Sequence, residues 1–420
     1  MKDSFVSIFF SKEKRQQNLL LLCCSLIFVG FVGARALISI SLVGIVLLAL
    51  FSQNIATTFR NYRKQPLLWL PSIFFFVLLF SGINSEDKNL WWLWVKIKIP
   101  FLLLPFAFAA FTRLSLETFY KLLYVFSNIV FFSACFVLAN YLFHLEVINA
   151  LILKGGAVPV PYSHIRYSLL LVFALFTFLW LAEKQFYFVS IQEIYFQYGA
   201  AVFLFIVLHI LAVRSGLLAL YLCLLFYVIR FLWLKKSWVV FIGSILVLVV
   251  SIFTAIKCVP SLSNKISYTK YDLADFSKGN IDDHSDGMRL ASLMVGVELI
   301  KENFWIGTGA GDILAESKKM CERKFPQIQN DLNRKMPHNE FLWIFAATGI
   351  FGFVAFCIAF LVPFFVGLSH KNWLFVVLHL IYLSSFLSEY SLEEQIGSMF
   401  YLIFLLLFLQ HFQQLKKEDA

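Results

Sequence analysis

Long apolar segments, separated by short polar turns, follow one another along most of the chain. An α-helix of about 20 apolar residues can cross the ~30 Å hydrocarbon core of a membrane. The segments are continuous rather than alternating, which distinguishes them from the strands of a membrane β-barrel. The pattern therefore predicts an all-α polytopic membrane protein with about 12 transmembrane helices, at residues 18–34, 36–52, 67–83, 91–111, 119–143, 164–181, 194–213, 216–233, 238–256, 339–368, 372–388 and 396–412.

One long polar segment, residues 257–338, interrupts this pattern between the ninth and tenth spans. Apolar residues recur at helical spacing over about 287–303, and a glycine-rich turn follows. Asp312 is expected to cap a second helix that runs to about Phe325. We expect these helices to form a cap on the outer ends of the spans. The chain is thus predicted to comprise three parts: spans 1–9 over 1–256, the helical loop over 257–338, and spans 10–12 with a tail over 339–420.

The composition excludes a soluble globule. Of the 420 residues, 60% are hydrophobic and 14% are charged. A soluble domain is about half apolar and about one quarter charged. Too few polar residues remain to cover a water-exposed surface, so a cytosolic enzyme, a secreted disulfide-rich scaffold and a disordered protein are all excluded.

The distribution of charge predicts the orientation in the membrane. The formal net charge is +10, and Lys and Arg accumulate in cytoplasmic loops. Placing both termini in the cytoplasm leaves few basic residues in the short outer loops: Arg35, Lys88, Lys154 and Arg214. The outer loops 84–90 and 389–395 carry acidic residues instead. We expect an uncleaved first span, the segment 257–338 on the outer side, and no nucleic-acid partner.

Several basic residues at the outer ends of the spans are candidates for anion binding. Arg214 closes the seventh span, Arg166 begins the sixth, and Lys96 and Lys98 lie one turn inside the fourth. Each side chain can extend its charge to the membrane surface or bind an anionic ligand there. The pattern leaves both interpretations open.

His338 is a candidate general base. It precedes the tenth span, at the N-terminus of the predicted helix. The helix dipole at that end disfavours the imidazolium, and a neutral ring is what a general base requires. A histidine in a membrane-surface loop is the other interpretation. Arg289 lies at the opposite end of the same outer segment.

The acidic run from Asp282 to Asp286 has the DDxxD pattern of some Mg²⁺ sites, but it occurs once and in a predicted loop. A solvated acidic turn is the favoured interpretation, so no metal site is expected. Cys258 and Cys321 both fall in the outer segment, where an oxidising compartment would allow them to pair.

The stretch from Pro337 to Phe353, PHNEFLWIFAATGIFGF, resembles the His-Asn…Gly-x-x-Gly signature of the O-antigen ligase and polymerase superfamily. The turn from Gly307 to Gly311 is similar to the Gly-x-Gly turn that precedes this signature. Arg289 occupies the family's loop-arginine position, and Arg214, in Arg-Ser-Gly, resembles its arginine between two spans. The predicted spans, cytoplasmic termini and single long outer loop also match.

This resemblance implies a GT-C-like glycosyltransferase of lipopolysaccharide biosynthesis in the bacterial inner membrane. It would move a glycan from an undecaprenyl diphosphate carrier to a sugar hydroxyl of lipid A–core on the periplasmic face. His338 would be the base, and Arg214 and Arg289 would bind the diphosphate, so that neither a metal nor another cofactor is expected. The secondary members of the site would be Arg166, Lys98, Lys96 and Asn339.

Three alternatives remain at this stage. An O-antigen polymerase would use a second lipid-linked glycan as the acceptor, and a protein O-oligosaccharyltransferase would use a protein. The short outer loop 144–163 favours a ligase over a polymerase. A secondary transporter is the alternative from a different class. It would require ionisable groups near the middle of the membrane, where His209 and His379 are the candidates.

Overall fold

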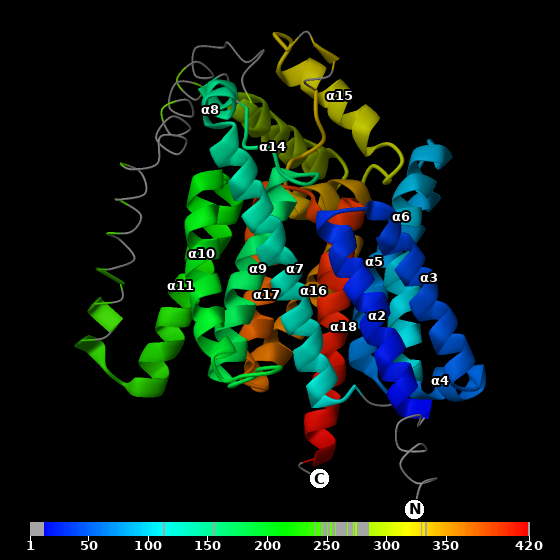
Figure 1. Cartoon of the computed structure of the whole chain (residues 1–420). Coiled ribbons are helices and arrows are strands. Elements are labelled where there is room, and N and C mark those ends of the chain that lie inside the picture. Colours follow the sequence, from blue (N-terminus) through cyan, green and yellow to red (C-terminus); the bar gives the residue numbers. More distant parts are fainter. Residues whose placement is uncertain are drawn as a thin grey trace, which may run out of the picture.

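The computed structural model describes residues 12–111, 114–153, 156–239, 285–328, 330–331 and 334–418, with isolated positions between 241 and 274. Over these residues the protein is helical and contains no strand, which confirms the predicted all-α polytopic fold (Figure 1). The helices run in chain order: α2 Lys12–Val32, α3 Arg35–Ser52, α4 Ile55–Arg63, α5 Leu70–Phe80, α6 Lys88–Ala110, α7 Leu116–Phe143, α8 Leu145–Leu153, α9 His164–Glu183, α10 Glu193–Leu211, α11 Arg214–Lys235, α14 Ser285–Glu302, α15 Ile313–Lys324, α16 Glu340–Ser369, α17 Trp373–Ser388 and α18 Gln395–Glu418.

Among the described residues, 9 helices are long and apolar enough to span a membrane. Two shorter apolar segments, Leu70–Ile83 and Trp373–Ser388, coincide with two further predicted spans. The predicted span at 238–256 lies partly outside the described residues, so the count of 12 stays a prediction. Helix α2 begins and α18 ends at the same end of the bundle, the lower end in Figure 1.

Helices α9 and α18 form the centre of the bundle, since 94% of the apolar window of each is buried inside the protein. Phenylalanine fills the space between them. The ring of Phe404 on α18 lies 4.7 Å from that of Phe173 on α9 and 4.7 Å from that of Phe126 on α7. Edge-to-face aromatic packing of this kind stabilises cores beyond the burial of area alone. The many aromatic residues thus pack helix against helix rather than only facing lipid.

Two short helices, α4 and α8, were not predicted from the sequence. In α4 the side chain of Asn54 accepts a hydrogen bond from the Ala56 amide and caps the helix. Helix α8 follows α7 after a break at His144. At 9 residues each, both are too short to give the long apolar pattern that identifies a span.

Helices α14 and α15 lie together at the upper end of the bundle in Figure 1, and their bounds agree with the predicted loop helices. The expected role of Asp312 is wrong. Its side chain makes no capping hydrogen bond to α15. The carboxylate instead accepts hydrogen bonds from the Glu86 and Asp87 amides, at 2.6 and 2.9 Å. The Asp312 side chain therefore joins the α14–α15 segment to the loop before α6.

Helix α16 is interrupted at Gly349, whose φ is +66°. The carbonyls left unpaired at this break, those of Ala346 and Ala347, accept hydrogen bonds from the amides of Thr308 and Gly309. A Cβ on Gly349 would lie 2.3 Å from the Trp305 carbonyl oxygen. Backbone hydrogen bonds thus join the Gly307–Gly311 turn to the break at Gly349, and they hold the N-terminal part of α16 against the turn after α14.

Candidate active site

A loop of six residues between α17 and α18, Glu389 to Glu394, contacts basic side chains from several helices at this end of the bundle. We call it the acidic loop. It carries three carboxylates, of which Glu389 and Glu393 are buried. Each carboxylate forms an ion pair with a base from a different helix or segment. The loop therefore sets the relative positions of these bases.

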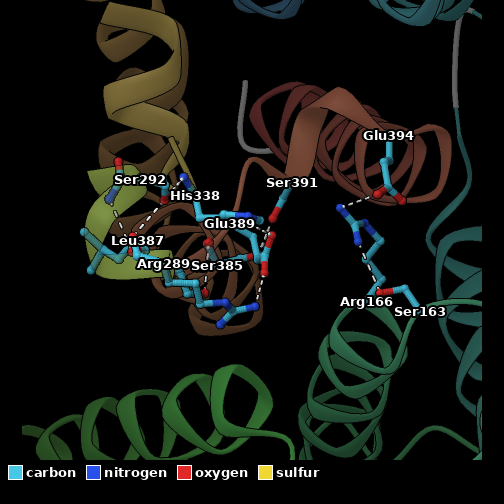
Figure 2. Close-up of polar contacts among 12 residues, drawn as sticks. Ser163, Arg166, Arg289, Ser292, His338, Ser385, Leu387, Glu389, Ser391 and Glu394 are labelled. Carbon is cyan, nitrogen blue, oxygen red and sulfur yellow. Dashed lines mark hydrogen bonds and ion pairs between the residues drawn. The ribbon is translucent and has the colours of Figure 1, made fainter. Parts of the chain in front are cut away.

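Glu389 joins Arg289 to His338, as Figure 2 shows. One carboxylate oxygen, Oε1, lies 2.5 Å from a terminal nitrogen of Arg289 on α14. The other, Oε2, lies 3.2 Å from Nδ1 of His338, just before α16. Two of the three main candidate residues from the sequence thus meet on one carboxylate that the sequence analysis did not single out.

The charge of Glu389 is maintained despite its burial. Burial raises the pKa of this carboxyl, but the hydrogen bond from His338 and the positive charges of His338, Arg289 and Arg166 outweigh that effect. The net result is a pKa below the usual range for glutamate. Glu389 is therefore an acceptor for two donors at neutral pH.

The helix start positions the His338 ring. The neighbouring Asn339 caps α16, because its Oδ1 accepts a hydrogen bond from the Leu342 amide at 3.0 Å. Its side-chain nitrogen donates to the Leu387 carbonyl at the end of α17. The amide of His338 itself donates to the hydroxyl of Ser292. The backbone on both sides of the imidazole is thereby fixed to α14 and α17.

The second ring nitrogen of His338, Nε2, is buried and has no hydrogen-bond partner among the described residues. With Nδ1 facing a carboxylate, the neutral ring carries its proton on Nδ1 and leaves a lone pair on Nε2. The side chain of His338 is 13% exposed. In its neutral form the ring thus offers a held nitrogen with a lone pair, which is what proton abstraction from a hydroxyl requires.

Arg214 lies at the first turn of α11 and pairs with Asp286 at the start of α14, at 2.7 Å. The side chain of Asp272 in turn accepts hydrogen bonds from the amides of Asp286 and Gly287. Of the acidic run that suggested a metal site, Asp282 and Asp283 lie outside the described residues. The described residues contain no group of three or more His, Cys, Asp or Glu that could hold a metal ion.

Arg166 and Lys98 pair with the other two carboxylates of the acidic loop. Arg166 lies 3.0 Å from Glu394 (Figure 2) and 3.2 Å from the hydroxyl of Ser163. Lys98 is 1% exposed and lies 2.8 Å from Glu393. Its ammonium group is therefore held inside the protein and is not free to extend outward. Lys96, two residues earlier, is exposed on α6.

The sequence did contain a signal for the acidic loop. Basic residues at membrane depth need partners, and 389–395 is an acidic loop on the same predicted side. What it lacked was the assignment of each base to a particular carboxylate. The cysteine pairing stays a prediction, because Cys258 lies outside the described residues.

An apolar cavity of about 450 Å³ lies beside the break in α16. It is lined by α5, by the turn after α14 and by α16, including Phe76, Ile306, Phe351 and Gly352. Asn84, Ser81 and Thr348 are its polar lining residues. The cavity suits an apolar chain rather than a charged group.

Comparison with known proteins gives a family match. Residues 199–357 match the family model described as O-Antigen ligase. The matched range runs from within α10 into α16 and contains Arg214, Arg289 and His338. A search of curated proteins finds no match. The family match supports membership of this chain in the O-antigen ligase superfamily.

Proposed function

We propose that this protein transfers an O-antigen-type glycan from a polyprenyl diphosphate carrier to a sugar hydroxyl of lipid A–core. The family match supports an enzyme of the ligase and polymerase type. The single observation that carries the finer proposal is the contact of His338 and Arg289 with the two oxygens of Glu389. It brings a candidate base and a candidate anion ligand to one point.

In the proposed reaction, Nε2 of His338 takes the proton of the acceptor hydroxyl as that oxygen attacks the anomeric carbon. The bond between the anomeric carbon and the diphosphate oxygen breaks in the same step. A single displacement of this kind inverts the anomeric centre. Glu389 holds the Nδ1 proton and stabilises the imidazolium that forms. Because Arg289 shares the same carboxylate, the charge of Glu389 is partly balanced before the step begins.

The leaving diphosphate requires positive charge. The side chains of Arg214 and Arg289 are 48% and 38% exposed, so both remain accessible to a ligand beside their carboxylate partners. Guanidinium groups bind phosphate oxygens in pairs and stabilise the charge that develops on the leaving group. Two arginines supply this charge without a metal ion, and we propose a metal-independent reaction. Buried Lys98 then serves to hold the acidic loop rather than to touch the donor.

Both substrates are anchored in lipid, which fits a site at the end of a membrane bundle. The cavity of about 450 Å³ beside α16 offers an apolar surface for the isoprenoid chain. We place the site on the periplasmic face of the bacterial inner membrane, with both termini in the cytoplasm. The excess of Lys and Arg in the short loops of the predicted cytoplasmic side supports this orientation.

The test is glycan transfer by the purified protein from a synthetic polyprenyl diphosphate donor to lipid A–core. His338→Ala should retain donor binding but lose transfer by about 10²–10⁴-fold. His144→Ala is the matched control, since His144 is exposed after α7 and should leave transfer unchanged. EDTA should have no effect. Near-normal transfer by His338→Ala, or loss with EDTA that Mg²⁺ restores, would overturn the mechanism. Transfer only to a second lipid-linked glycan would identify a polymerase.

A further inference from the structure

A second polar pocket lies at the opposite end of the bundle from the acidic loop, where α9 and α16 end and α17 begins (the lower end in Figure 1). Its volume is about 240 Å³. Pockets for drug-sized ligands measure about 300–1,000 Å³, so this one suits a small group rather than a glycan. Its lining includes Glu183, Lys184, Arg230, Lys371, Asn372 and His411.

Positive charge exceeds negative charge in this pocket. Lys184, Arg230 and Lys371 face it, with Glu183 as the acidic residue in the lining. Glu183 is occupied by its neighbours, because it accepts hydrogen bonds from the hydroxyl of Tyr227 at 2.6 Å and from the indole of Trp373 at 2.9 Å. Its carboxylate is 3.4 Å from Arg230. The two lysines therefore leave a net positive charge.

The start of α17 adds to this positive potential. Asn372 caps the helix by accepting a hydrogen bond from the Phe375 amide, and both Asn372 and Trp373 line the pocket. Amides in the first turn of a helix, together with the helix dipole, favour an anion at this position. Helix α17 is 16 residues long, so its dipole is fully developed.

His411 on α18 is the independent sign of a ligand. It is 4% exposed and lines the pocket, yet its Nδ1 has no hydrogen-bond partner within the described part of the chain. The ring is held in place by stacking on Phe119, with centroids 4.4 Å apart. Lys184 and His370 are close enough to act on it electrostatically. A buried polar nitrogen without a partner costs free energy unless a bound group satisfies it.

We infer that this pocket binds a phosphate group. The three positive side chains, the helix start and the His411 imidazole all line one small volume, and a tetrahedral phosphate offers several oxygens that can accept hydrogen bonds there. Tyr120, Trp180 and Trp373 also line it. Aromatic residues of these types gather at the level of lipid headgroups. A phospholipid headgroup is the source that fits this position, and free inorganic phosphate shares the same chemistry.

Binding can be measured on the full-length protein in detergent by native mass spectrometry. The probes are short-chain phosphatidylglycerol, a glycerolipid without phosphate, and inorganic phosphate. The test variant is Lys184→Gln with Lys371→Asn, since asparagine tolerates the left-handed φ of +51° at position 371. We expect this variant to bind phosphatidylglycerol about tenfold more weakly than the wild type. His411→Phe keeps the stack on Phe119 and removes the nitrogen, and it should also weaken retention.

The matched control is Arg63→Gln with Lys64→Gln, which removes two positive charges from α4 and its C-cap at the same end of the bundle, outside the pocket. It should retain the lipid as the wild type does. Displacement of the lipid by inorganic phosphate would support a site that recognises only the phosphate group. Equal retention by all variants, or equal retention of the glycerolipid without phosphate, would overturn the inference. Hydrogen exchange at α17 in the apo and lipid-bound states separates loss of binding from misfolding.

Discussion

Oε2 of Glu389 lies 3.2 Å from Nδ1 of His338, although 51 positions separate the two residues. The same carboxylate holds Arg289 through its other oxygen. In this arrangement the carboxylate fixes both the tautomer and the orientation of the ring. A base held in this way is already oriented and does not need to rotate its ring before it reacts.

Replacing Glu389 by Gln keeps the shape of the side chain and removes its charge. We expect transfer to fall by roughly 10²–10⁴-fold, because an amide can present its NH₂ group to the ring and favour the wrong tautomer. Glu394→Gln is the control in the same loop, and unchanged transfer by Glu389→Gln would exclude an orienting role for Glu389.

Replacing Arg214 or Arg289 by Ala should weaken donor binding as well as turnover. The diphosphate is charged in both the ground state and the transition state, so the two effects are expected together. Lysine should rescue only part of the loss, because an ammonium cannot form the two-pronged contact of a guanidinium. Isothermal titration with donor and steady-state kinetics separate the two effects. Full rescue by lysine would argue for a simple charge effect.

Lys98→Ala and Lys96→Ala form a matched pair on one helix. Lys98 is buried against Glu393, whereas Lys96 is exposed. Breaking a buried ion pair leaves an uncompensated charge and costs about 3–5 kcal/mol, so Lys98→Ala should unfold at a much lower temperature. Lys96→Ala should change stability by less than about 0.5 kcal/mol. Equal thermal stability of the two variants would show that Lys98 does not hold the acidic loop.

Gly349→Ala should destabilise the protein because the φ of +66° disfavours any Cβ and the Trp305 carbonyl would lie 2.3 Å from it. The conformational part alone costs about 1–2 kcal/mol. Gly199→Ala in α10 is the control, since nothing lies within 4 Å of a Cβ there, and it should be neutral or stabilising by about 0.5–1 kcal/mol. Thermal melts of both variants, with transfer assays, give the comparison.

The stability of the region around the acidic loop should depend on pH through Glu389. The pKa of this group is lowered from 4.5 in the folded protein. Its contribution is therefore complete above pH 4.5 and is lost as the pH falls through the lower folded value. The melting temperature of the wild type should drop over this acid range by more than that of Glu389→Gln. Parallel pH profiles of the two proteins would contradict this assignment.

The sequence indicated most of the spans because each is a long local pattern, and it singled out Arg289 and His338 as candidates through motifs. Glu389 was missed because its role depends on how the ends of α14, α16 and α17 meet. Lys98 illustrates the same limit. Its depth in the helix was evident, but whether it faced lipid or Glu393 depended on the packing of α6 against a loop almost 300 positions later. Short helices α4 and α8 lacked any span-length signal.

The acidic loop also affects how the protein responds to the thickness of its membrane. Helices adjust to a thinner or thicker bilayer by tilting. At one end of the bundle, α6, α9 and α14 are tied to this loop through Lys98, Arg166 and Arg289. Tilting is therefore expected to pivot about this end and to displace the opposite ends of the helices. The distances within the site would then stay constant across bilayers of different composition.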